Sequence, residues 1–173
     1  MKIIFLDVDG VLTYDGSGTS DSMGLDVSRI RLLRKIVDET GAKIVLSSSW
    51  KHGYSKINGA KREFYKTLER HLAVCGLEIY DITDNIKSEF PDGYSDIEDV
   101  DIHCKFGTGR GAEVHRWIQE NRPESYVILD DENYDWDLYS MDKNWVQPSW
   151  YDPDGGLHPE HVQQAISILQ STK

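Results

Sequence analysis

IIFLDVDGV, residues 3–11, joins a short apolar run to two aspartates that are separated by one residue. Four consecutive apolar residues are typical of a strand that is buried on both faces of a parallel sheet. Asp7 and Asp9 follow at the end of this run, and Gly10 allows the chain to turn away sharply. The stretch therefore predicts a buried first strand that ends in a pair of carboxylates.

Apolar runs and helical periodicities alternate along the rest of the chain. Their spacing predicts further strands at 43–46, 77–82, 126–129 and 145–146, and helices at 27–40, 60–75, 111–120 and from 159 onward. Residues 10–26 are expected to form an irregular flap, and residues 84–102 a long, acidic, exposed loop. Alternation of this kind predicts one α/β domain over 1–173, with a central parallel five-stranded sheet flanked by helices.

The composition limits the class of protein. Of the 173 residues, 39% are hydrophobic and the formal net charge is −11, which argues against a non-specific binder of duplex DNA or of anionic membranes. Cys75 and Cys104 are too far apart for a CxxC motif and are expected to be reduced thiols. The first apolar run stops at Asp7, and no apolar stretch is long enough to span a bilayer. We expect a soluble, cytoplasmic protein with no membrane partner.

Three of the predicted strands end in reactive polar groups. The first ends in Asp7, the second in Ser47, and the fourth in the pair Asp130-Asp131. In an open α/β sheet, chemistry gathers in the crevice beyond the carboxyl ends of the strands. Carboxylates that crowd into one crevice repel each other unless a cation lies among them, and an oxygen-rich set of this kind suits Mg²⁺.

The same segments resemble the motifs of a known superfamily. DVDGV, LSSSW and LDDE resemble motifs I, II and IV of the haloacid dehalogenase (HAD) superfamily of phosphoryl-transfer enzymes. RGAEVHRW at 110–117 and the segment 156–166 make the chain most similar to the HAD domain of Swiss Army Knife RNA repair proteins. The resemblance covers nearly the whole chain and implies a single Rossmann-like domain.

The resemblance also implies roles for the acids. Asp7 would attack phosphorus and form an aspartyl-phosphate. Asp9 would protonate the leaving oxygen, deprotonate the hydrolytic water, and offer its backbone carbonyl to the metal. Asp131 would be the third contact to Mg²⁺. Asp130 would lie beside it, or would contact a metal ligand rather than the metal itself.

Two alternatives stand for each of the residues that would contact the phosphate. Ser47 is the first polar residue after the second strand and would bond a phosphoryl oxygen, with Ser48 as the competing choice. Arg110 is the best candidate for the motif III cation, and Lys105 is an upstream alternative.

Two features of the chain predict the class of substrate: the expected absence of a cap domain and the distribution of charge. We expect no separate cap domain, which favours a polymeric or large phosphorylated partner, although the 84–102 loop could fold over the site. Candidate substrate-binding residues near the strand ends are Gly10, Ser48, Trp50 and Lys51.

Residues 50–72 are basic and contain aromatic side chains, a pattern that could dock a single nucleic-acid strand. A solvated helix face with Trp50 in the core is the competing explanation.

The leading hypothesis is a capless, Mg²⁺-dependent phosphatase that acts on polynucleotide ends such as a 3′-phosphate of RNA or DNA. A phosphatase for small nucleotides or phosphoproteins is one alternative, and a catalytically silent binding scaffold is the other. The sequence predicts no oligomeric state.

Overall fold

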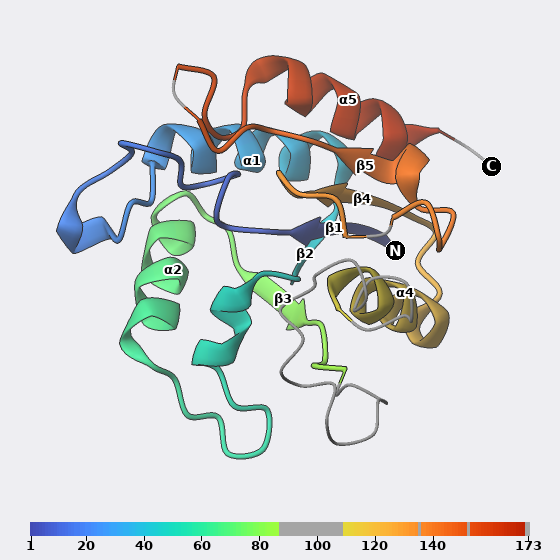
Figure 1. Ribbon diagram of the computed structural model, residues 1–173, viewed down its shortest axis with the longest axis horizontal. Coiled ribbons are helices and arrows are strands. Elements are labelled where there is room, and N and C mark those ends of the chain that lie inside the picture. The colour runs from blue at the N-terminus through green and yellow to red at the C-terminus, as the bar shows by residue number, and fades with distance from the viewer. Residues whose placement is uncertain (87–108, 135, 152, 172–173) are drawn as a thin grey trace, which may run out of the picture.

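A five-stranded sheet in which every neighbouring pair runs parallel forms the centre of the structure (Figure 1). The computed structural model describes residues 1–86, 109–134, 136–151 and 153–171. The strands follow the order β3-β2-β1-β4-β5. They are β1 (Lys2–Leu6), β2 (Lys43–Leu46), β3 (Ile79–Ile82), β4 (Ser125–Leu129) and β5 (Trp145–Val146).

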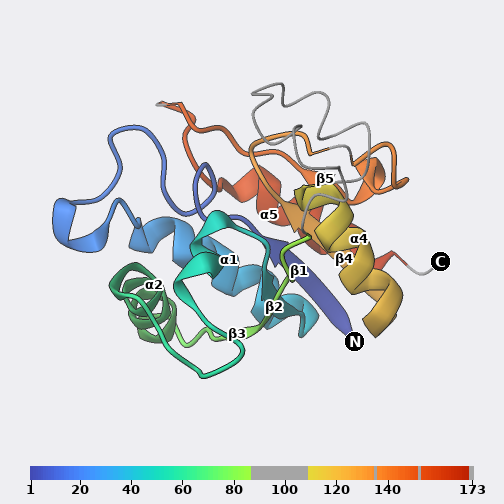
Figure 2. The same cartoon turned by 60° about the horizontal axis from the view of Figure 1, so that its bottom comes forward.

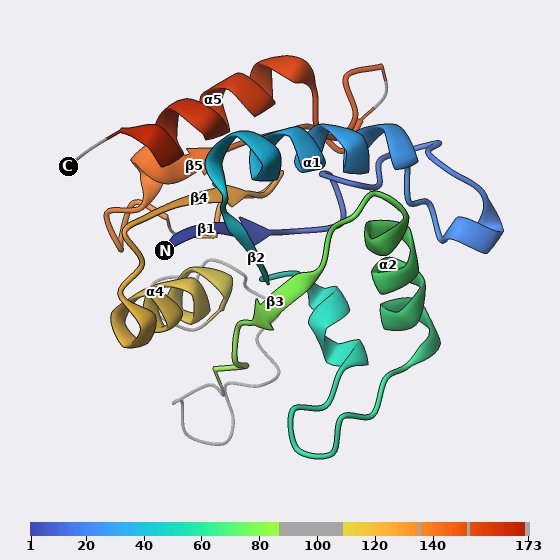
Figure 3. The ribbon, with the colours of Figure 1, turned by 180° about the vertical axis from the view of Figure 1, so that it is seen from behind.

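Helices cover both faces of this sheet, because side chains alternate along each strand. On one face, Ile4 and Leu6 of β1 share a core with side chains of α1, α2 and α5. On the other face, Ile3 and Phe5 pack with α4, where Trp117 meets the Phe5 ring edge-on. Figure 1 and the view from behind in Figure 3 show α1 and α5 on one side of the sheet and α4 on the other. The helices are α1 (Val27–Thr40), α2 (Glu63–Val74), α4 (Arg110–Asn121) and α5 (Pro159–Gln170).

Local sequence signals fix the ends of these helices. Asp26 caps α1, since its side chain accepts a hydrogen bond from the backbone N–H of Ser28. Gly41 ends the same helix in the left-handed region at φ 68°. Pro159 opens α5 at a position where no backbone donor is needed.

The expected fold is confirmed, with small shifts at the boundaries. The second helix begins at Glu63 rather than near residue 60, and β3 begins at Ile79 rather than at residue 77. Within the expected flap, a short 3₁₀ helix, η1 (Ser20–Ser22), interrupts the irregular chain. Most of the expected acidic loop, 87–102, lies outside the described residues. No second sheet and no added helical layer is found in the described ranges. None of the helices described has the length and hydrophobicity of a transmembrane segment.

The register of the sheet places the predicted site residues in one row. Leu6 pairs with Leu46 on one side and with Leu129 on the other. Parallel strands end at the same edge, and Figure 2 shows β1 running from the N-terminus into this edge, with α4 packed beside β4. The residues that follow, Asp7 and Ser47, stay hydrogen-bonded across the edge: Asp7 N–H donates to the Leu129 carbonyl at 2.9 Å, and Ser47 N–H to the Leu6 carbonyl at 3.0 Å.

Candidate active site

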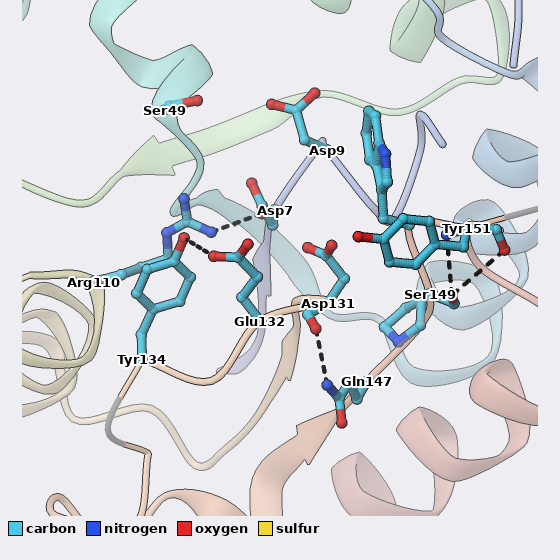
Figure 4. A pocket seen from close by; sticks show the side chains of 12 residues that line it. Asp7, Asp9, Ser49, Arg110, Asp131, Glu132, Tyr134, Gln147, Ser149 and Tyr151 are labelled. Carbon is cyan, nitrogen blue, oxygen red and sulfur yellow. Dashed lines mark hydrogen bonds and ion pairs between the residues drawn. The ribbon is translucent and has the colours of Figure 1, made fainter. Parts of the chain in front are cut away.

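A pocket of about 760 Å³ lies at the carboxyl edge of the sheet (Figure 4). The ends of β1 and β4 contribute Asp7, Asp9 and Asp131 to its lining, and the first turn of α4 contributes Arg110. The segment 147–151, which follows β5, forms another wall. Four parts of the chain that are distant in sequence therefore meet around Asp7, Asp9 and Asp131.

Three carboxylates form a tight cluster beside this pocket. Asp7, Asp130 and Asp131 each offer an oxygen, and these oxygens lie within 4.8 Å of one another. Burial, together with repulsion from Asp7, raises the pKa of Asp131 to about 6. Burial and Asp7 also raise the pKa of Asp130. A hard divalent cation would relieve this crowding, and the all-oxygen donor set fits Mg²⁺.

Arg110 is the cation that holds the cluster together in the described residues. One of its terminal nitrogens, Nη1, lies 2.7 Å from Asp7 Oδ2 and 2.7 Å from Asp130 Oδ2. Its guanidinium stacks over the Tyr134 ring, 4.2 Å from the centroid. Burial lowers the pKa of Arg110, but the attraction of Asp130 and Asp7 outweighs this and raises it, so the side chain stays charged.

Asp130 and Asp131 occupy different positions in the cluster. Asp130 is fully buried, and besides Arg110 it accepts a hydrogen bond from the Glu132 backbone N–H, 3.0 Å from Oδ1. Both of its carboxyl oxygens are therefore engaged by protein groups. Asp131 lines the pocket and is only partly buried, which makes it the better placed of the two to reach a metal ion.

Asp9 lines the same pocket but its carboxylate stands outside the cluster of three (Figure 4). Thr13 donates a hydrogen bond to Oδ1 at 3.0 Å, and the Trp50 indole N–H donates to Oδ2 at 3.1 Å. Burial raises the pKa of Asp9, and repulsion from Asp7 adds to the rise, while the Thr13 and Trp50 bonds oppose it. A carboxyl group tuned upward in this way suits proton transfer.

Two of the predicted substrate-binding residues contact the acids of the site. Gly10 is buried at φ +73°, and a Cβ built there would overlap the carboxyl group of Asp131. Only glycine allows this close approach. Trp50 is turned toward Asp9 and meets the Phe64 ring edge-on. Neither Gly10 nor Trp50 lines the pocket.

The serines of the LSSSW stretch divide into three environments. Ser47 is 1% exposed, and its hydroxyl has no hydrogen-bond partner among the described residues. Ser48 is fully buried and caps the 3₁₀ helix η2 (Ser49–Gly53) by accepting from the Trp50 backbone N–H at 3.4 Å. Ser49, which the sequence analysis did not single out, is the serine that lines the pocket. Ser47 does not line the pocket, and its predicted contact with a phosphoryl oxygen stays a prediction that its unpartnered hydroxyl permits.

Lys51 is buried. Its ammonium forms a buried ion pair with Glu113 of α4 and donates to the Thr83 hydroxyl at 2.9 Å. Burial lowers the pKa of Lys51, although Glu113 opposes the shift. Lys51 does not line the pocket, and its predicted substrate contact stays a prediction. The pair ties the end of β3 and the residues after β2 to the first turn of α4, which carries Arg110.

The basic stretch 50–72 is largely neutralised by nearby acids. Among its described ion pairs are Lys56 with Asp84 at 2.7 Å and Lys61 with Glu69 at 2.7 Å. The expected strand-docking surface is therefore less positive than its sequence indicates. Lys105, the alternative motif III cation, lies outside the described residues.

The wall formed by 147–151, together with Glu132 and Tyr134, lines the pocket without having been predicted from the sequence. Gln147 donates from its side-chain amide to the Asp131 carbonyl at 2.9 Å, which fixes this wall to the acid cluster. The available signal was positional: these residues follow the fifth strand at the same edge of the sheet as Asp7 and Asp131.

Comparison with known proteins agrees with this geometry. Residues 3–162 match the model of one family, described as the HAD domain in Swiss Army Knife RNA repair proteins. No curated protein and no solved structure gives a significant match to the chain. With the parallel sheet and the acids at its carboxyl edge in place, the chain belongs to this family of HAD domains.

Proposed function

We propose that this protein is a Mg²⁺-dependent phosphohydrolase that forms an aspartyl-phosphate on Asp7 and acts on phosphorylated nucleic-acid ends. The observation that carries the proposal is the meeting of Asp7, Asp131 and Arg110 at one pocket. A nucleophile, a carboxylate for the metal and a fixed cation are the parts that phosphoryl transfer needs. Family membership supports the same class of chemistry.

Asp7 and Asp131 would hold the metal ion, together with the backbone carbonyl of Asp9. When bound, Mg²⁺ would offset the charges of the phosphate and of the carboxylate that attacks it. Repulsion from Asp7 contributes to the raised pKa of Asp131, and a cation at this position would offset that repulsion.

Asp7 would carry out the first step. A carboxylate oxygen of Asp7 bonds to phosphorus while the bond from phosphorus to the leaving oxygen breaks. Asp9, whose pKa is raised by burial, gives its proton to that oxygen.

Asp9 would then drive the second step. Its carboxylate takes a proton from water, and the resulting hydroxide attacks phosphorus. The bond from phosphorus to Asp7 breaks, inorganic phosphate leaves, and both side chains return to their starting states.

Arg110 and Ser47 would bind the transferred group. Arg110 lies 2.7 Å from Asp7 Oδ2, so a phosphate at Asp7 would come within reach of the guanidinium. Ser47 follows β2 at the same edge and has an unused hydroxyl among the described residues. Arg110 is held by Asp7 and Asp130 before substrate arrives, which favours stabilisation of the transition state.

Phosphate release from a panel of substrates tests the proposal. The panel holds a 3′-phosphorylated oligonucleotide, a nucleoside monophosphate and a phosphopeptide, assayed with Mg²⁺ and after metal removal. We expect the oligonucleotide to be preferred, and turnover to be lost in Asp7→Asn and without metal. A wild-type protein that is inert across several divalent metals would favour a silent scaffold, and an oligonucleotide no better than the mononucleotide would reject the nucleic-acid substrate.

A further inference from the structure

Two aromatic side chains lie exposed in the wall of the pocket that holds Asp7. Tyr151 is 72% exposed and Trp150 is 36% exposed, and both line this pocket. Figure 4 shows the Tyr151 ring across the pocket from Tyr134 and Arg110. Large aromatic faces left open to water beside a cluster of acids form a surface that a flat apolar ligand would cover.

The backbone of this wall is held by hydrogen bonds. The Ser149 hydroxyl accepts from the Tyr151 N–H at 3.1 Å, and the Ser149 carbonyl accepts from the Gly156 N–H at 2.7 Å. The Trp150 carbonyl accepts from the Asp15 N–H at 2.8 Å. These hydrogen bonds hold the backbone that carries the two rings. A ligand that stacks on the rings would therefore cause little further loss of backbone conformational entropy.

The charges around the pocket exclude recognition through many phosphates. Arg110 is the one cationic residue in the described lining, and Asp7 and Asp130 already engage it. Asp7, Asp9, Asp131 and Glu132 contribute acids to the same lining. Among the described lining residues, a polyanion would find one cation and no row of lysines or arginines, so uncharged contacts with these residues would have to supply the rest of its affinity.

We propose that Trp150 and Tyr151 form a stacking site for the nucleobase next to the phosphate that Asp7 attacks. The inference rests on the proposed function, because it assigns the nucleotide that carries this phosphate. Every base has a flat π face, so stacking of this kind accepts any base and reads no sequence. The pocket volume of about 760 Å³ lies within the range of small-ligand sites.

Binding of short oligonucleotides to the full chain tests the stacking site. The ligands are two 3′-phosphorylated oligonucleotides that differ only at the terminal nucleotide, which carries a base in one and is abasic in the other. Their dissociation constants are measured by fluorescence anisotropy with Mg²⁺, in an Asp7→Asn background that prevents hydrolysis. Tyr151→Ala and Trp150→Ala remove each ring, and Tyr151→Phe keeps the ring and removes only the hydroxyl.

We expect the protein to bind the base-bearing ligand roughly 5- to 150-fold more tightly than the abasic one, the range that stacking of one base supplies. Tyr151→Ala or Trp150→Ala should remove most of this preference, and Tyr151→Phe should retain it. The inference is overturned if the parent protein does not distinguish the ligands, or if both alanine variants keep the preference.

A separate assay distinguishes failure of stacking from failure of the proposed function. Phosphate release from glycerol phosphate, which has no aromatic group, is measured with the wild-type protein alone. Turnover of glycerol phosphate without a base preference in binding would reject the stacking site and leave the phosphatase intact. A base preference without turnover of any ester would reject the phosphatase and leave an aromatic nucleotide-binding site.

Discussion

The backbone of Gly10 packs directly against the carboxyl group of Asp131, so that no side chain fits between the first strand and the fourth at this point. Gly10 also has a positive φ of +73°, which L-residues with side chains rarely adopt. The absence of a side chain at Gly10 therefore allows the first strand and Asp131 to approach each other in the acid cluster.

Gly10→Ala should abolish Mg²⁺ binding and phosphate release. The new methyl group would push Asp131 away from Asp7, and the strained φ would lower the free energy of unfolding by about 1–2 kcal/mol. Isothermal titration with Mg²⁺ and chemical unfolding measure the two effects.

Gly41→Ala is the matched control for this change. Gly41 has a similar φ of +68°, but a Cβ there would meet nothing within 4 Å. We expect a comparable loss of stability with unchanged Mg²⁺ affinity. Equal loss of Mg²⁺ affinity in both variants would show that strain, not the contact with Asp131, is responsible.

Arg110→Met should destabilise the fold as well as the chemistry. It leaves Asp7 and Asp130 without their common partner, and an uncompensated buried charge costs about 3–5 kcal/mol. Adding Asp130→Asn should recover part of that stability but none of the phosphate release, which falls on the order of 100-fold or more. A double variant no more stable than Arg110→Met would contradict this account of the ion pairs.

The stability of the metal-free protein should depend on pH through Asp131. Its pKa of about 6 lies above the ordinary 3.8, so its contribution to stability is greatest below about pH 4 and is lost as the pH rises through 6. Asp131→Asn should therefore raise the free energy of unfolding by about 1–2 kcal/mol at pH 7.5, allowing for solvent screening, and by almost nothing at pH 4.

Chemical unfolding in a chelator at both pH values measures this difference. Mg²⁺ should stabilise the wild-type protein at pH 7.5 and have a smaller effect on Asp131→Asn, because the wild type alone has the full set of acids. A stability difference of the same size at pH 4 and pH 7.5 would contradict the assignment to Asp131.

Lys51→Met separates a structural role from a substrate contact. Loss of the buried pair with Glu113 should lower the free energy of unfolding by about 3–5 kcal/mol. Lys61→Met removes a more exposed pair with Glu69 and should cost less than about 1 kcal/mol. If Lys51 bound substrate instead, its loss would raise KM and leave stability unchanged.

The sequence predicted the sheet and the convergence of its acids because both follow from simple rules. The apolar run before Asp7 indicates a buried strand. Because parallel strands end at one edge of the sheet, Asp7 and Asp131 were expected to lie close together. Arg110 was found through the family resemblance, and the structure brings it to Asp7. The catalytic roles of these residues stay predictions.

The contacts that the sequence did not reveal are those between side chains that are far apart in the chain. Nothing around Lys51 identifies Glu113, 62 positions later, as its partner. Tyr151 follows a strand of only two residues, too short to show a period that would locate the pocket wall. The positive charge of 50–72 was visible in the sequence, but its pairing with acids outside the stretch, Lys56 with Asp84 and Lys51 with Glu113, became visible only in the fold.

Trapping of the covalent intermediate tests the central claim most directly. Asp9→Asn should slow hydrolysis of the intermediate, because it removes the base that activates water. After rapid mixing with an activated phosphate monoester and Mg²⁺, acid quenching and peptide mass spectrometry should find one phosphoryl group on Asp7. The label should be absent without Mg²⁺. The proposed intermediate would be contradicted if the wild-type protein released phosphate while Asp7 of the Asp9→Asn variant stayed unmodified. Full activity in Asp7→Asn would contradict it as well.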